Sequence, residues 1–287
     1  MNNFGVASPL IIKTVLCIDF PPLLCYNTYG GDDGMYTFLS NLLSDKKGGE
    51  IFTCFGIWHI CFIALFLCLG IFLCLYLKNN SNEKQERIID KVISIAFGLY
   101  IADFFLMPFA YGEIDIEKLP FHVCTAMCVG CFFTRRVTFL KKYKIQFAIL
   151  GFVSNLIYLI YPAGVMWHAV HPFSYRVIQT LSFHGIMMVY GLLVLIYETE
   201  NFTWKKCYRD FFVILSMVIW ALLGNLLYNS ESREYNWFFV VRDPFNMFSE
   251  SIARFIMPVL NMVIFFGVEL LIYFIFSKFR KLFNDKK

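Results

Sequence analysis

The sequence predicts an all-α integral membrane protein, a polytopic helical bundle of about seven transmembrane helices. Three observations predict it: 59% of the 287 residues are hydrophobic, the mean hydropathy is +0.61, and the hydrophobic residues occur in long runs. A single soluble core of this size could not bury so many apolar side chains. The basic residues lie in short clusters between the runs, which is the pattern of membrane loops and not of a nucleic-acid surface. We therefore expect membrane lipids as partners and no nucleic acid.

Seven segments are long and apolar enough to be read as spans, since a helix needs about 20 mainly apolar residues to cross the hydrocarbon core. The third segment is the shortest, because Arg135 and Arg136 follow it, and we expect it to extend by snorkelling or to begin in the interfacial region. The polar stretch 79–86 is predicted to be a loop. The predicted spans are residues 51–77, 92–111, 119–133, 145–161, 173–197, 211–228 and 252–276.

The distribution of lysine and arginine predicts the orientation. Basic residues are concentrated after the first, third, fifth and seventh spans, and the positive-inside rule places such loops in the cytoplasm. The N-terminus is then outside and the C-terminus cytoplasmic. This gives an extracytoplasmic N-terminal segment at 1–50, a transmembrane helical domain at 51–277 and a basic cytoplasmic tail at 278–287, in a multi-pass protein of the plasma membrane or the endoplasmic reticulum. The oligomeric state stays open.

Polar residues inside the spans are the candidate site residues, because each is costly to bury in a bilayer. They favour the outer half of the predicted bundle, where one cavity would solvate them together. On the fifth span Arg176, Thr180 and His184 recur at four-residue intervals and share one helix face. The candidates are Asp103, His122, Cys124, Arg176, Gln179, His184 and Asn225.

Cys124 is the candidate nucleophile, and its base is expected from another helix. His122 is two residues away and would point about 200° away from Cys124 around a regular helix. His184, near mid-membrane in the fifth span, is the obvious donor.

Each of these residues also has a purely structural interpretation. A membrane cysteine is usually a packing residue, and a mid-span histidine can serve an interhelical hydrogen bond. Arg176, near a helix end, can snorkel to phosphate headgroups. The sequence contains no Gly-rich phosphate loop, no Gly-x-Ser-x-Gly elbow and no His-Glu-x-x-His motif, so no cofactor and no metal site is expected.

A family resemblance begins at residues 119–124, Leu-Pro-Phe-His-Val-Cys, which resemble the Leu-Pro-Leu-His-Leu-Cys signature of the YwaF-like integral membrane proteins. Residues 172–200 contain Arg176, Gln179 and Ser-Phe-His-Gly at 182–185, and they resemble that family's Arg-x-x-Gln and Ser-His-Gly region with a phenylalanine inserted. Gly224-Asn225 and the Arg-Asp-Pro run at 242–244 resemble its Gly-Ala-Asn-Tyr motif and downstream proline. The match covers roughly residue 51 to the C-terminus.

That family is similar to transmembrane protein 164, whose animal members are described as cysteine-dependent acyltransferases that remodel phospholipids. The resemblance implies that Cys124 and His184 pass an acyl chain from one lipid to a lysolipid. In this hypothesis His184 is general base and then acid, and Arg176 binds the lipid phosphate. The remaining candidates stabilise the oxyanion or bind substrate: His122, Gln179, Asn225 and Asp103.

Two other classes of function stay open. One is a non-enzymatic carrier or permease-like protein, in which the same polar residues line a permeation path. The other is a membrane assembly subunit with no site of its own.

Overall fold

The computed structural model describes residues 38–39, 41–43, 49–111, 115–166, 169–198, 207–230, 234–243 and 247–284. These residues form helices joined by turns, with no strand among them, so the predicted all-α membrane bundle is confirmed. Six of the described helices are long and apolar enough to cross a membrane, and α5 (Val123–Thr134) is apolar but shorter. The six are α3 (Ile57–Leu77), α4 (Asn82–Tyr111), α6 (Lys144–Ile160), α7 (Tyr175–Tyr197), α8 (Cys207–Tyr228) and α9 (Glu250–Asn284).

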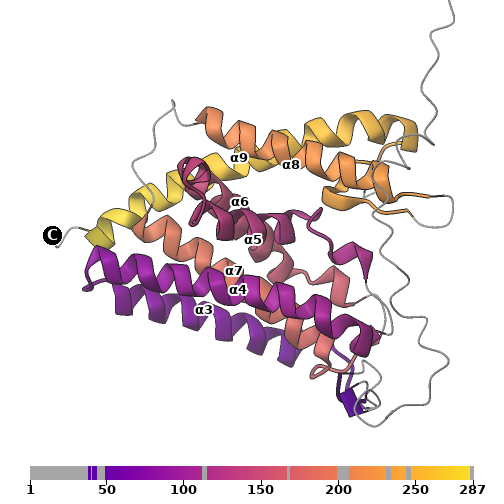
Figure 1. Ribbon diagram of the computed structural model, residues 1–287, viewed down its shortest axis with the longest axis horizontal. Helices are drawn as coiled ribbons and strands as arrows, with labels where there is room; N and C mark the ends of the chain where they lie inside the picture. The colour runs from indigo at the N-terminus through magenta and orange to yellow at the C-terminus, as the bar shows by residue number, and fades with distance from the viewer. Residues whose placement is uncertain are drawn as a thin grey trace, which may run out of the picture.

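Helix α7 is the centre of the bundle. It packs against α3 and α4 on one side and against α6 on the other, while α8 and α9 pair with each other beyond α6 (Figure 1). Two glycines allow these close approaches. A Cβ at Gly185 would lie 2.2 Å from the Phe66 ring of α3, and a Cβ at Gly191 would lie 2.5 Å from the Phe152 side chain of α6. No larger residue fits either position without displacing a neighbouring helix.

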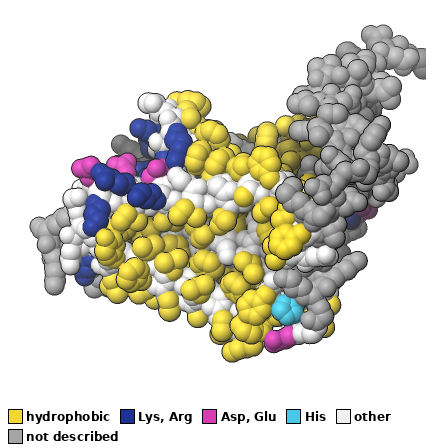
Figure 2. Space-filling view, turned by 60° about the horizontal axis from the view of Figure 1, so that its bottom comes forward, with side chains coloured by type: hydrophobic (Ala, Val, Ile, Leu, Met, Phe, Trp, Pro, Cys, Tyr) yellow, Lys and Arg dark blue, Asp and Glu magenta, His cyan; other side chains and the backbone are white. Residues whose placement is uncertain are grey.

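The outer surface of the bundle is apolar along its length. Figure 2 shows hydrophobic side chains covering the middle of one face, with lysine, arginine and acidic side chains gathered towards one end. On α3 and α4 the exposed residues include Leu67, Phe72, Ile95 and Phe105, which water would solvate poorly and lipid chains would cover. The protein is therefore an integral membrane protein.

The basic end of the bundle, as we call it, is the end where α3 passes into α4 and α5 passes into α6. Here α4 begins at Asn82, so most of the stretch 79–86 is helical and the prediction of a loop there is wrong. The reason is local. Ser81 accepts a hydrogen bond from the Lys84 backbone N–H at 3.4 Å, and the Gln85 side chain donates to the Leu77 carbonyl at 2.9 Å, which closes the turn between the helices.

The start of α5 also differs from the prediction. Only 12 residues are helical, about 18 Å at 1.5 Å per residue, and the predicted span began four residues earlier, at residue 119. The preceding segment turns instead, because proline at 120 restricts the backbone and the Phe121 N–H bonds to the Leu119 carbonyl at 2.7 Å. His122 is the N-cap residue with an extended backbone, so the 200° angle expected between His122 and Cys124 does not apply.

Candidate functional site

Aromatic packing holds the start of α5 in place, at the end of the bundle opposite the basic end. The Phe121 ring lies 5.0 Å from the Trp220 ring of α8 and 4.9 Å from the Trp237 ring of η5 (Trp237–Phe239). Trp220 also donates its indole N–H to the Pro120 carbonyl at 2.6 Å. Gly224 of α8 lies directly against Phe121, since a Cβ there would come within 2.4 Å of the ring. Helix α8 therefore determines where α5 begins.

Cys124 is the second residue of α5, so its thiol lies in the first turn of a helix. The first backbone N–H groups of a helix have no partner within it, and together with the helix dipole they stabilise an anion such as a thiolate. The thiol is partly buried between the two apolar clusters of the core and hydrogen bonds to the Ser154 side chain of α6. The Cys124 thiol thus has both a polar neighbour and the positive end of a helix beside it.

His184 is held in one tautomer. Its Nδ1 lies 2.7 Å from the Thr180 carbonyl of the same helix, and a carbonyl can only accept, so Nδ1 carries the hydrogen. Nε2 is therefore the nitrogen with the lone pair, as a general base requires. In His59, by contrast, both ring nitrogens have partners. Nδ1 accepts from the Phe55 N–H at 2.9 Å, and Nε2 donates to the Leu159 carbonyl at 2.8 Å. His59 is bonded at both ring nitrogens, whereas the hydrogen bond of His184 engages Nδ1.

Tyr158 connects the two candidate catalytic residues and was not singled out from the sequence. Its ring stacks on the His184 imidazole, with 3.8 Å between centroids and 10° between planes. The Tyr158 hydroxyl lies close enough to Cys124 and Arg176 to interact with both electrostatically. It reaches this position over Gly164, where a Cβ would lie 2.6 Å from the hydroxyl oxygen. A sequence signal existed: Ser154 and Tyr158 are one turn apart on a largely apolar helix.

Arg176 lies near Tyr158 and near Glu117, which belongs to η1 (Ile116–Lys118) just before α5. Partial burial and the neighbouring Asp115 raise the pKa of the Glu117 carboxyl, and Arg176 partly offsets this rise. A positive charge near Tyr158 is suited to an anionic group such as a lipid phosphate.

Asp103 is engaged in an ion pair. Its carboxylate is 2% exposed, accepts from Lys118 Nζ at 2.6 Å and accepts from the Tyr175 hydroxyl at 2.7 Å. These bonds tie α4 to η1 and to the first turn of α7. The structure therefore gives Asp103 a role in assembling the site from three elements.

Asn225 is likewise bonded to backbone. Its side chain donates to the Ala221 carbonyl at 2.8 Å and accepts from the Trp237 N–H at 3.1 Å, so it holds η5 against α8. Gln179 accepts a hydrogen bond from the neighbouring Thr180 hydroxyl at 3.2 Å. His122, at the N-cap of α5, lies within electrostatic range of His184. Tyr158 thus stacks on His184 and lies near Cys124 and Arg176, whereas His122 is shown near His184 only. The Asn225 side chain is engaged by backbone groups.

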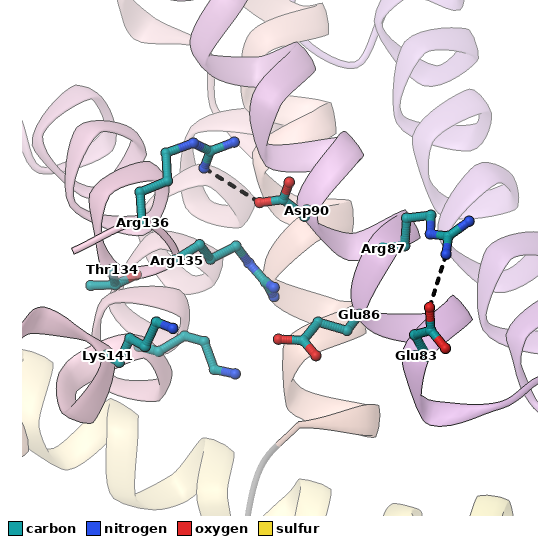
Figure 3. A pocket seen from close by; sticks show the side chains of 9 residues that line it. Glu83, Glu86, Arg87, Asp90, Thr134, Arg135, Arg136 and Lys141 are labelled. Atoms are coloured by element: carbon teal, nitrogen blue, oxygen red, sulfur yellow. Dashed lines mark hydrogen bonds and ion pairs between the residues drawn. The ribbon is translucent and has the colours of Figure 1, made fainter. Parts of the chain in front are cut away.

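A second polar region lies at the basic end, far along α5 from Cys124. It is a pocket of about 410 Å³, with an acidic wall from α4 and a basic wall from the segment that joins α5 to α6 (Figure 3). Its ion pairs are Arg136 with Asp90 at 3.3 Å and Arg87 with Glu83 at 3.0 Å. Between this pocket and Cys124 the bundle is filled by side chains that are at most 2% exposed, among them Met127, Cys128, Cys131 and Met187.

Comparison with known proteins identifies the chain at the level of a family. The model of the TMEM164 family matches residues 54–279, which include the whole site and all the described spanning helices except the end of α9. No curated protein and no solved structure matches the chain. On the extent of that family match, the chain belongs to the TMEM164 family.

Proposed function

We propose that this chain is a membrane-embedded lipid acyltransferase, which moves an acyl chain between phospholipids through a thioester on Cys124. The observation that carries the proposal is the convergence of Cys124 and His184 on Tyr158, with a histidine tautomer that leaves Nε2 available as a base. A partly buried thiol needs a base to ionise, because an apolar environment disfavours the anion.

The proposed reaction has two balanced steps. In the first, His184 takes the thiol proton while the Cys124 sulfur attacks the ester carbonyl of a donor phospholipid. The ester C–O bond breaks, a thioester forms, and the released lysolipid oxygen takes the proton from His184. In the second, the hydroxyl of an acceptor lysolipid loses its proton to His184 and attacks the thioester. This returns the proton to the Cys124 sulfur as the new ester leaves.

The surroundings supply the two other requirements of acyl transfer. The unpartnered backbone N–H groups at the start of α5 can stabilise the oxyanion that forms on the attacked carbonyl. The His122 imidazole and the Gln179 amide can add N–H donors at this end of the bundle. Arg176 supplies a positive charge for the phosphate of the donor or acceptor lipid.

The test is an acyl-transfer assay on purified protein in lipid nanodiscs, with a labelled phospholipid donor and a lysophospholipid acceptor. We expect Cys124→Ala and Cys124→Ser to fold, to lose transfer and to lose the hydroxylamine-sensitive acyl label that a thioester gives. The matched control is Cys128→Ala, at a fully buried position one turn further along α5. This variant should lose about 1 kcal/mol of stability through poorer packing, and it should keep both acyl transfer and the acyl label. Full transfer by Cys124→Ala would end the thioester mechanism.

A second candidate function is a carrier, and the charged pocket at the basic end is the observation that favours it. A carrier needs a polar path from that pocket to Cys124, and buried methionine and cysteine side chains fill the bundle between them. Liposome flux of a phosphorylated solute, unchanged in Cys124→Ala and reduced in Arg135→Ala, would favour the carrier over the enzyme.

A further inference from the structure

The structure contains a buried carboxylate cluster that the proposed acyl transfer does not use. It lies between α6, α8 and α9, one turn inside the basic end, and consists of Gln146, Asp210, Glu269 and Tyr273. Glu269 is 0% exposed and Asp210 is 1% exposed. The two carboxyl groups are close enough to repel each other. Ionised carboxylates are rarely buried at this depth unless a positive charge or hydrogen-bond donors accompany them.

The oxygens of this cluster lack partners. Among the described residues, five buried side-chain oxygens or nitrogens have no hydrogen bond, and four of the five belong here: Gln146 Oε1, Asp210 Oδ2 and both carboxylate oxygens of Glu269. The bonds that do form hold the cluster together. Gln146 donates its amide N–H to the Tyr273 hydroxyl at 3.3 Å, and that hydroxyl donates to Asp210 Oδ1 at 3.5 Å. When the two carboxyl groups are ionised, these unpartnered atoms are all acceptors, so only a cation or a hydrogen-bond donor can satisfy them.

Two described cations near the cluster, Arg209 and Lys144, have other partners. Arg209 acts on Asp210, but its guanidinium donates to the Lys142 carbonyl at 3.3 Å and to the Tyr208 hydroxyl at 3.2 Å. Lys144, two residues before Gln146, pairs with Glu198 at 2.9 Å. Both of these described cations are therefore shared with other acceptors, and four buried acceptor oxygens of the cluster keep no hydrogen bond.

We propose that the carboxylate cluster binds a hard metal cation. Carboxylate, amide and hydroxyl oxygens from three helices are the donor set that Ca²⁺ accepts together with water, and a sodium ion uses the same oxygens. The described residues contain no group of three or more His, Cys, Asp or Glu that could hold a metal ion, so the proposed site would rest on two carboxylates with one amide and one hydroxyl oxygen. The absence of nitrogen and sulfur donors in this set fits a hard ion. A bound cation would join α6, α8 and α9 at the point where the carboxyl groups of Asp210 and Glu269 otherwise repel each other.

The experiment is thermal unfolding of the purified full-length protein after chelation with EDTA, titrated with Ca²⁺, Mg²⁺ or Na⁺ at constant ionic strength with choline chloride. Ligand that binds only the folded state raises the Tm in proportion to the logarithm of its concentration. We expect a saturable rise with at least one ion, and a response to Na⁺ alone would identify a monovalent site. Glu269→Gln and Asp210→Asn should lose the dependence on ion concentration. The matched control is Glu250→Gln, an exposed carboxylate on the same helix, which should keep it.

Two results would overturn the proposal. One is a Tm of the wild-type protein that responds to none of the three ions, which needs no variant to fold. The other is equal ion dependence in wild type and Glu269→Gln. A wild-type Tm that ignores every ion but rises on acidification would assign the cluster to a shared proton, and acyl transfer by Cys124 would be unaffected by either outcome.

Discussion

At the scale of single residues, the important finding is that Tyr158 stacks on the candidate base and lies within electrostatic range of the candidate nucleophile. Its ring covers the His184 imidazole and its hydroxyl interacts with Cys124 and Arg176. Ring and hydroxyl are therefore expected to have separate roles. The ring orients the imidazole by stacking, and the hydroxyl adjusts the polarity around the thiol.

Tyr158 substitutions should separate these roles. Tyr158→Phe keeps the stacked ring, so we expect kcat for acyl transfer to fall by about tenfold or less. Tyr158→Ala removes the ring and lets His184 rotate, and misplaced catalytic groups commonly cost about 10²-fold in rate. The assay is kcat of lipid acyl transfer, with the Tm measured alongside to confirm assembly. Equal losses in the two variants would remove the orienting role of the ring.

Glu117 gives a pH dependence whose sign follows from burial. Its pKa is raised in the folded protein, so the native state favours the protonated carboxyl. The contribution of the protonated Glu117 carboxyl to folding stability is fully present below the ordinary glutamate pKa of about 4.3. It is lost as the pH rises through the raised pKa of Glu117 in the folded protein. Glu117→Gln cannot ionise, so its Tm should fall less than that of the wild type across this window. Glu83→Gln, an exposed carboxyl, is the control and should follow the wild type.

At the scale of helices, the site depends on how closely α6 and α7 approach, because Tyr158 is on α6 and His184 is on α7. The two helices lie close together at Gly191, where a Cβ would lie 2.5 Å from Phe152 Cβ and 3.0 Å from the Ala148 carbonyl. Gly191→Ala should therefore cost about 1–3 kcal/mol by overpacking and should lower kcat by separating the stacked rings. Gly98→Ala on α4, where a Cβ meets nothing within 4 Å, is the control and should change neither Tm nor kcat.

The buried carboxylate of Asp103 is a second contact between helical elements, because it bonds to Lys118 of η1 and to Tyr175 of α7. Asp103→Ala leaves Lys118 without its carboxylate and removes the acceptor of the Tyr175 hydroxyl, so we expect a loss of about 3 kcal/mol of stability and a lower Tm. Because Asp103 ties both η1 and α7 to α4, KM for the lipid should rise as well. Arg136→Ala, which breaks an ion pair on the half-exposed surface, should cost about 1 kcal/mol or less. A similar loss of stability in Asp103→Ala and Arg136→Ala would contradict the expectation that the buried ion pair contributes more than the half-exposed one.

At the scale of the whole molecule, the distribution of charge leads to a prediction of topology. The basic end should face the cytoplasm, and the end with Cys124 should face outward. In intact cells an impermeant thiol reagent should label Glu117→Cys and Ser230→Cys above the wild-type background, and should not label Lys84→Cys. Labelling of Lys84→Cys without labelling of Glu117→Cys would place the site on the cytoplasmic side and reverse the orientation.

The site was partly predictable from the sequence. His184 and Cys124 could be singled out because polar residues are conspicuous in apolar spans, and Arg176 shares a helix face with His184. The first-turn position of Cys124 could not, since the turn before α5 is held by Trp220 and Trp237, which are about 100 residues away in the chain. The partners of Asp103 and Asn225 were equally hidden, because their bonds join different elements.

The sequence by itself determined the class of the protein, because hydrophobic run length and loop charge depend only on the order of residues. It also determined the order of the spans and the family, through short motifs at 119–124 and 182–185. Only the tertiary structure decided which polar residues meet. The stacking of Tyr158 on His184 and the unpartnered oxygens of Asp210 and Glu269 arise where helices distant in sequence pack together. The physical reason is that insertion into a bilayer follows local hydrophobicity, whereas a site depends on helix packing.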